Sequence, residues 1–309
     1  MPYDAVLLIA FGGPTRPEEI RPFLEIVTRG RRIPPARLEE VAHHYERMPG
    51  GRSPLNELTR AQASRLEAAL ARDGRTLPVF VGMRNWHPFL HETLAEMAAR
   101  GHHRVLGLIL SVLRCEASWD RYRDDVAAAR ARTPGAPEVE FTDPWFAHAG
   151  HLDAVAARAR DALAGVPAAH RARAPLVFTA HSIPVAMADE APYVSELTAV
   201  AHAVAGRVGR TQYSIAYQSR SGAPGDRWLE PDINDVLRTL AEEKHGHAVV
   251  VPAGFVCDHV EVLYDLDVEA RATAAAAGLT LHRAAAVNDH PDFIAALADV
   301  VRRTERAAA

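Results

Sequence analysis

The stretch PLVFTAHSIP (residues 175–184) decides the fold, because it shows a buried strand running into a loop. Apolar and β-favouring residues end at His181, just before a proline turn. In open parallel α/β sheets, ligands bind at the loops that follow the carboxyl ends of the strands. A histidine at such a place can accept a proton or ligate a metal at neutral pH. From this segment alone, a hydrogen-bonded core histidine is an equally good interpretation.

A second stretch, AVVVPAGFVCDHVEVLYDLDVE (residues 248–269), begins as a strand and continues as a helix. Glu261, Asp265 and Glu269 follow each other at four-residue spacing, which places three carboxylates on one helix face. Like charges at this spacing destabilise a helix, and no Lys or Arg follows until Arg271. The line of acids therefore indicates a path for a cation. An ordinary exposed acidic face is the alternative.

Composition describes a soluble globular protein of 309 residues, long enough for two α/β domains, with 48% hydrophobic and 24% charged residues. A formal net charge of −4 argues against nucleic-acid binding. Neither a signal peptide nor an apolar run long enough for a transmembrane segment is evident, so we expect a cytoplasmic protein. Two cysteines, Cys115 and Cys257, are too few for a four-cysteine zinc site or iron–sulfur cluster.

Short strands alternate with helices, which predicts an α/β fold with parallel sheets covered on both faces. We expect two Rossmann-like, doubly wound domains, residues 1–145 and 146–289, with a C-terminal helix in 290–309 packed back on the first. Strands are expected at about 4–10, 77–82, 104–111, 138–142, 175–181, 212–217, 247–254 and 279–284. Helices are expected at 15–27, 53–72, 88–100, 118–132, 151–164, 193–207, 231–243, 258–277 and 291–304. The Gly12-Gly13-Pro14 sequence matches no phosphate-loop spacing and predicts a tight turn.

Seven segments, taken in order, resemble the ferrochelatase family, whose members insert ferrous iron into a porphyrin. They are FGGP (11–14), GGRSPLN (50–56), GMRNWHPF (82–89), AHSIP (180–184), YQSR (217–220), WLEP (228–231) and FVCDHVEVLYDLD (255–267). The resemblance covers nearly the whole chain. It implies the chelatase fold, in which two Rossmann-like domains face each other across a porphyrin cleft.

The resemblance also implies that His181 and Glu261 are the catalytic pair at the point of metal insertion. Asp265 and Glu269 would continue from them as an outer metal site. Metal insertion must remove two pyrrole protons, and a neutral imidazole beside a carboxylate can serve as proton acceptor or as transient iron ligand. The sequence leaves open which of the two residues takes the protons and which first holds iron. Nitrogen and oxygen ligands suit ferrous iron but also zinc and cobalt.

The region 27–45 is similar to the bacterial members that act on coproporphyrin III and make coprohaem. Four propionates on that substrate favour guanidinium and hydroxyl groups at the rim of the cleft. The candidates for these contacts are Arg29, Tyr45 and Ser53, with Arg31 or Arg32 as further ones. Phe11 and Trp228 are candidates to line the porphyrin site, with core packing an equally good interpretation, whereas core packing is favoured for Trp86. The loop 113–119 departs from the family's usual Ser/Tyr/Thr-rich sequence.

The expected function is therefore insertion of ferrous iron into coproporphyrin III during haem biosynthesis. Protoporphyrin IX as the substrate is the alternative, and a non-catalytic tetrapyrrole or metal carrier is a more distant one. Ferrous iron is a substrate here, and we expect neither a permanently bound cofactor nor an iron–sulfur cluster. The expected partners are the porphyrin and iron, with no nucleic acid; a haem-acceptor protein is not identifiable from the sequence.

Overall fold

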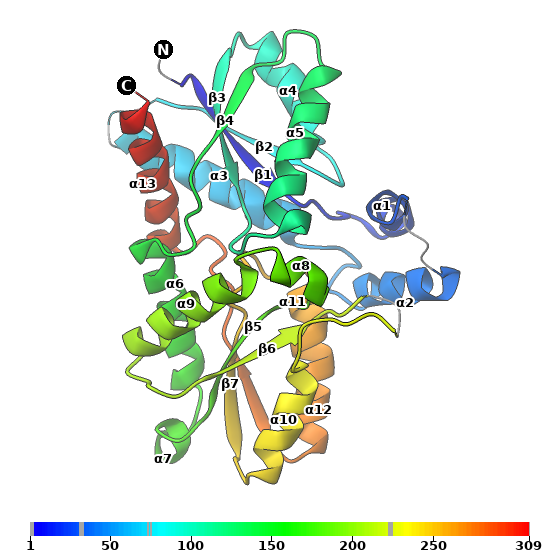
Figure 1. Cartoon of the computed structure of the whole chain (residues 1–309), viewed down its shortest axis with the longest axis vertical. Helices are drawn as coiled ribbons and strands as arrows, with labels where there is room; N and C mark the ends of the chain where they lie inside the picture. Colours follow the sequence, from blue (N-terminus) through cyan, green and yellow to red (C-terminus); the bar gives the residue numbers. More distant parts are fainter. Residues whose placement is uncertain (1–2, 31–33, 73, 75, 222–224, 309) are drawn as a thin grey trace. The chain divides into compact units, whose positions relative to one another are not determined.

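The computed structural model describes residues 3–30, 34–72, 74, 76–221 and 225–308 (Figure 1). Two four-stranded parallel sheets form its framework, with strand orders β2-β1-β3-β4 and β6-β5-β7-β8. The strands are β1 (Ala5–Ala10), β2 (Val79–Met83), β3 (Arg104–Ile109), β4 (Glu138–Phe141), β5 (Leu176–His181), β6 (Ser214–Gln218), β7 (His247–Val251) and β8 (Thr280–Arg283). The prediction of an α/β fold with parallel sheets is confirmed.

Helices connect the successive strands, as parallel pairing requires. The α-helices are α1 (Ile20–Val27), α2 (Pro35–Glu46), α3 (Leu55–Arg72), α4 (Leu90–Ala99), α5 (Arg121–Ala131), α6 (Ala149–Ala164), α7 (Ala168–Arg171), α8 (Val185–Asp189), α9 (Tyr193–Arg207), α10 (Ile233–Glu242), α11 (Val260–Val262), α12 (Arg271–Ala276) and α13 (Pro291–Ala307). A 3₁₀ helix, η1 (Pro17–Glu19), and two π-helices, η2 (Glu116–Asp120) and η3 (Leu263–Ala270), complete the set. The sequence analysis missed α2, α7 and α8.

The chain divides into two compact units. The first contains the residues up to Leu110, Trp119–Asp143 and the residues from Ile294 onward; the second contains Ser111–Ser118 and Pro144–Phe293. A buried carboxylate explains why the short segment Ser111–Ser118 belongs to the second unit. Glu196, on α9, is 3% exposed and accepts hydrogen bonds from the Arg114 backbone N–H (2.8 Å) and Nε (2.5 Å). The sequence analysis did not anticipate this crossing of the chain.

In the first unit, the central strand β1 is buried along its whole length, which matches its uninterrupted apolar sequence. The chain then turns at Gly12, whose φ of +86° lies in the left-handed region. A Cβ at this position would meet atoms of Met83 and Trp86 at 3.0 Å. The tight turn predicted for Gly12-Gly13-Pro14 is confirmed, because the backbone at Gly12 approaches β2 and the loop after it.

In the second unit, helices cover both faces of the sheet (Figure 1). α6 and α9 pack on β7 and β5, while α10, η3 and α12 pack on β6 and β8. Apolar residues of that second group of helices form a core with the inner strands, including Val250, Leu266 and Ala274. This core holds the helical region that follows β7 against the sheet.

The helix predicted at 258–277 exists, but its hydrogen-bond register changes twice. It begins as α11, becomes the π-helix η3 over Leu263–Ala270, and returns to α-helical form in α12. The helix predicted at 118–132 likewise starts with the π-helix η2. Sequence periodicity did not reveal either change. π-Helical turns are rare and occur frequently at functional sites.

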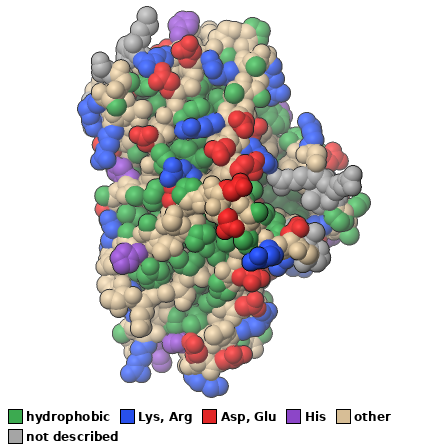
Figure 2. Space-filling view, viewed as in Figure 1, with side chains coloured by type: hydrophobic (Ala, Val, Ile, Leu, Met, Phe, Trp, Pro, Cys, Tyr) green, Lys and Arg blue, Asp and Glu red, His purple; other side chains and the backbone are tan. Residues whose placement is uncertain are grey.

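The visible face carries basic and acidic side chains interspersed over the units (Figure 2). This distribution agrees with the small net charge of −4. In the described ranges, no helix combines the length and apolar character needed to cross a membrane. The expectation that the protein does not bind nucleic acid stays a prediction.

Candidate active site

His181 is the last residue of the inner strand β5, and hydrogen bonds fix the backbone around it. The Tyr193 hydroxyl donates to the His181 carbonyl oxygen at 2.9 Å. The next residue, Ser182, donates its N–H to the Gln218 carbonyl at 2.7 Å and its hydroxyl to the Leu229 carbonyl at 2.8 Å. The end of the strand is therefore held from three neighbouring segments, as a precisely placed side chain requires.

The imidazole of His181 is oriented by its own chain. Its Nδ1 lies in hydrogen-bond contact with the carbonyl oxygen of Ser182. Because a carbonyl can only accept, Nδ1 carries the hydrogen, and the neutral ring keeps its lone pair on Nε2. Nε2 lies 3.9 Å from Oε1 of Glu261, and the side chains are 28% and 45% exposed. The structure thus brings together the two residues that the sequence analysis paired.

Glu261 belongs to the short helix α11, and its backbone is bound on both sides. Its N–H donates to Nδ1 of His259, the N-cap residue, at 3.1 Å. Its carbonyl accepts from Nε2 of Gln218 at 2.7 Å. Gln218 ends β6 and pairs with His181 in the sheet, so one strand end supports both members of the pair.

The sequence analysis missed His259, although a polar residue directly before a helix is the usual signal for an N-cap. Burial lowers the pKa of His259, and the nearby His181 lowers it further, against the opposing effects of Glu261 and Asp258. A neutral ring is what the capping bond requires, because Nδ1 must accept the N–H of Glu261. His259 thus supports the position of Glu261 through the backbone.

Asp265 lies in η3, four residues after Glu261, and is partly buried. Burial raises the pKa of its carboxyl to about 8; a hydrogen bond from the Ser219 hydroxyl opposes this, while Glu261, Glu269 and Asp232 add to it. At neutral pH this carboxyl therefore retains its proton for most of the time. An arriving cation would have to displace that proton, and it would relieve the repulsion between the acids.

Glu269 is exposed at the far end of the acidic line. Across the described ranges, no group of three or more His, Cys, Asp or Glu side chains is arranged so that it could hold a metal ion. The arrangement is a close pair, His181 and Glu261, followed by two further acids along η3.

The first unit brings together two of the residues expected to contact the porphyrin. Phe11 and Tyr45 both pack against Phe23, with ring centroids 6.4 and 5.8 Å apart. Trp86 joins the same cluster, is 9% exposed and donates its indole N–H to Glu19 at 2.8 Å. The core role favoured for Trp86 is confirmed.

The other expected porphyrin contacts differ in their exposure. Arg29 is exposed directly after α1. Ser53 is only 5% exposed, and its hydroxyl accepts from the N–H of Leu55 at 3.3 Å. Trp228, in the second unit, is half-buried, and its buried indole Nε1 has no hydrogen-bond partner among the described residues. Arg31 and Arg32 lie outside the described residues.

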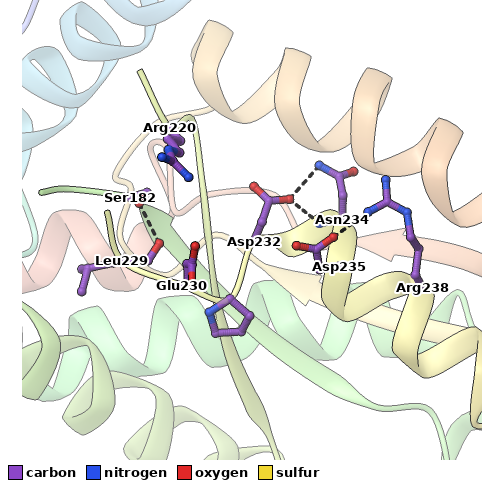
Figure 3. Close-up of a pocket in the computed structure, with 9 residues that line it drawn as sticks. Ser182, Arg220, Leu229, Glu230, Asp232, Asn234, Asp235 and Arg238 are labelled. Atoms are coloured by element: carbon purple, nitrogen blue, oxygen red, sulfur yellow. Dashed lines mark hydrogen bonds and ion pairs between the residues drawn. The ribbon is translucent and has the colours of Figure 1, made fainter. Parts of the chain in front are cut away.

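A cavity of about 750 Å³ opens beside Ser182 in the second unit (Figure 3). Two of its carboxylates have partners among the lining residues: Asp232 accepts from the backbone N–H of Asn234 at 2.8 Å, and Asp235 lies 2.6 Å from Arg238. The lining consists of Ser182, Arg220, Leu229, Glu230, Pro231, Asp232, Asn234, Asp235 and Arg238. The sequence analysis did not predict this cavity, since its walls come from three separated segments.

Comparisons with known proteins show the family and the fold of this chain. The ferrochelatase family profile matches residues 3–305. A protein named coproporphyrin III ferrochelatase, from Mycobacterium avium, is 45% identical over 306 residues, which are 97% of this chain and 88% of that protein. A protein named ferrochelatase, from Rhodopirellula baltica, is 39% identical over 97% of this chain and 86% of its own length.

Among solved structures, SirB from Bacillus subtilis with Fe³⁺ superimposes with a TM-score of 0.60. It covers 98% of this chain and 96% of its own, at 14% sequence identity, so the likeness shows a shared fold. The two parallel sheets are therefore those of the chelatase fold. The chain belongs to the ferrochelatase family, and it is an enzyme that inserts metal into a porphyrin.

Proposed function

We propose that this protein inserts ferrous iron into coproporphyrin III, forming coprohaem and releasing two protons. The observation that carries the proposal is the approach of His181 Nε2 to Glu261 Oε1, 3.9 Å apart at the carboxyl end of the sheet. The names of relatives at 42–45% identity support coproporphyrin III as the substrate.

His181 serves as the acceptor of the pyrrole protons. Its Nδ1 is engaged by the Ser182 carbonyl, which leaves the lone pair on Nε2 free to accept a proton. The protonated ring then carries a positive charge beside the Glu261 carboxylate, which stabilises it. The same pair offers one nitrogen and one oxygen to ferrous iron, which accepts both kinds of ligand.

Asp265 and Glu269 guide the metal toward this pair. Glu269 is exposed and meets the hydrated cation first, while Asp265 lies closer along the helix and is partly buried. Loss of the Asp265 proton when the cation arrives keeps the local charge nearly balanced. The acids lower the electrostatic cost of bringing a divalent ion to the insertion point.

Five residues are proposed to contact the porphyrin's carboxylates and ring. Arg29 is exposed and can pair with a propionate, and Tyr45 and Ser53 offer hydroxyl groups. Phe11 and the half-buried Trp228 provide aromatic surface for the ring. Ferrous iron is a substrate, and the absence of a permanent cofactor, like the cytoplasmic location, stays a prediction.

The decisive experiment supplies ferrous iron anaerobically with either coproporphyrin III or protoporphyrin IX and follows the Soret band. We expect turnover of coproporphyrin III to be much faster. Comparable rates with both porphyrins would remove the substrate assignment. Tight binding without turnover of either would instead show a carrier.

A further inference from the structure

The helical segment 260–270 carries Glu261 and Asp265 through the change from α11 to the π-helix η3. π-Helices are rare and mostly limited to a single turn, whereas η3 extends over eight residues. Such a segment needs support from outside the helix to keep its register. The direction in which the acidic side chains point depends on that register, because each change of turn size rotates all the following residues.

Arg283 provides this support from the end of β8. Its Nη1 lies 2.7 Å from Oδ1 of Asp258, which precedes α11. Its Nε and Nη2 bind the two oxygens of Asp267, within η3, at 2.9 and 2.8 Å. The three side chains are only 13%, 15% and 26% exposed, respectively, and a two-pronged guanidinium–carboxylate pair is strong and directional. One side chain therefore spans the segment from before Glu261 to beyond Asp265.

The Asp258 end of this connection is fastened in turn to the loop after β8. Asn288 Nδ2 donates to Asp258 Oδ2 at 2.8 Å, and the Asp258 N–H donates back to Asn288 Oδ1 at 2.8 Å. The Ala286 N–H adds a bond to Asp258 Oδ1 at 3.1 Å. Asp258 therefore cannot shift without breaking several bonds, so Arg283 links η3 to a rigid point.

The opposite flank of the segment is held from the other edge of the sheet. Gln218, at the end of β6, binds the Glu261 carbonyl, and Ser219 binds the Asp265 carboxyl. β6 and β8 are the two edge strands of this sheet. Contacts from both edges leave the segment little freedom to rotate about its own axis.

We propose that Arg283 is a positioning residue for metal insertion, which joins Asp258 to Asp267 and thereby aims Glu261 and Asp265 toward His181. The inference rests on the proposed roles of these acids. Arg283 need not touch either substrate, because its effect is on the hydrogen-bond register of η3. Loss of Arg283 should raise the apparent KM for ferrous iron and leave the affinity for porphyrin unchanged.

The test compares Arg283→Gln with Arg271→Gln in the full-length protein. Arg271 contacts the same Asp267 carboxylate at 3.2 Å, but from an exposed position, so its replacement is a matched control. In Arg283→Gln we expect the apparent KM for ferrous iron to rise by about 10- to 100-fold, as for other residues that orient metal ligands. The porphyrin Kd, measured by fluorescence quenching, should stay close to that of the wild type, as should all parameters of Arg271→Gln.

A folded Arg283→Gln protein with wild-type iron kinetics would overturn the inference, and so would a parallel loss of porphyrin binding, which a merely structural role predicts. If that variant does not fold, Asp267→Asn decides in its place, because it keeps the bond from Arg283 to Asp258 and the side-chain shape. We expect the same rise in KM, of smaller size, and an unchanged KM would refute the proposal. Full activity of Glu261→Gln would instead remove the proposed role of Glu261, on which this inference rests, whereas no turnover of either porphyrin by the wild type would remove the proposed function.

Discussion

The two sheets have the same strand order, each counted from its own first strand, yet different residues stand at equivalent places. β1 and β5 are both inner strands of six residues, and they end in Ala10 and His181. In both units, the second strand donates a backbone N–H to a proline carbonyl just before the next helix: Met83 to Pro88, and Tyr217 to Pro231. The scaffold is thus repeated, and the proposed chemistry depends on the side chain at one strand end.

The helices after the third strands also differ in a way that matters for the site. η2 contains five residues in π-helical form, whereas η3 contains eight and carries Asp265 and Glu269 of the proposed metal path. The comparison teaches that both units share the backbone framework of a site, which is a strand end with a helix after the third strand. The second unit, which carries His181 and Glu261, differs from the first in its longer π-helix and in the hydrogen bonds that hold this helix in place.

The largest effect is expected when the two strand ends are made alike, by placing at the end of β5 the alanine that ends β1. His181→Ala should lower the rate of iron insertion by about 10²- to 10⁴-fold, since the proton acceptor is lost. Porphyrin binding, measured by fluorescence quenching, should remain largely intact. His202→Ala, on the exposed side of α9, is the control and should behave like the wild type. A near-normal rate in His181→Ala would refute the catalytic role.

A second change tests how tightly the strand end in the second unit is packed. A Cβ on Gly254 would meet the Cβ of Ala180 at 2.5 Å, next to His181, so Gly254→Ala must displace the strand. We expect the free energy of unfolding to fall by about 1–3 kcal/mol, measured by urea denaturation, with a loss of turnover. Gly246→Ala has no heavy atom within 4 Å of its new Cβ and is the control. Equal stability of the two variants would contradict the packing argument.

The third change tests the electrostatics of η3. Burial raises the pKa of Asp265 to about 8 in the folded protein, while an unfolded aspartate titrates near ~4. Between these values the folded state binds the additional proton, so the wild type loses stability as the pH rises through this window. Asp265→Asn removes the effect and should raise the Tm more at alkaline than at acidic pH.

The same variant should raise the apparent KM for iron several-fold, because one acid of the proposed path is lost. In the wild type that KM should fall as the pH rises toward about 8, since the metal competes with the Asp265 proton. Glu269→Gln, at an exposed position, is the comparison for the KM and should leave the pH dependence of the Tm nearly unchanged. A pH-independent difference in Tm for Asp265→Asn would show that its carboxyl is not perturbed.

Much of the architecture followed from local patterns in the sequence. Apolar runs such as residues 175–180 and 248–251 predicted buried strands, and the alternation of strands with helices predicted the parallel sheets that both units contain. The position of His181 at a strand end followed from the same reading. Four-residue spacing predicted Glu261, Asp265 and Glu269 on one helix face. The structure places all three in the helical region from α11 into η3, and their shared face stays a prediction. These features depend on neighbours in sequence, so a single chain reveals them.

The tertiary structure alone decided how the site is held. The 3.9 Å approach of His181 to Glu261, the π register of η3 and the clamp made by Arg283 all depend on residues distant in sequence. Even His259, which is local to Glu261, owes its neutral state to burial. Hydrogen bonds and desolvation act only when the chain has brought these groups together, so no periodicity along the sequence encodes them directly.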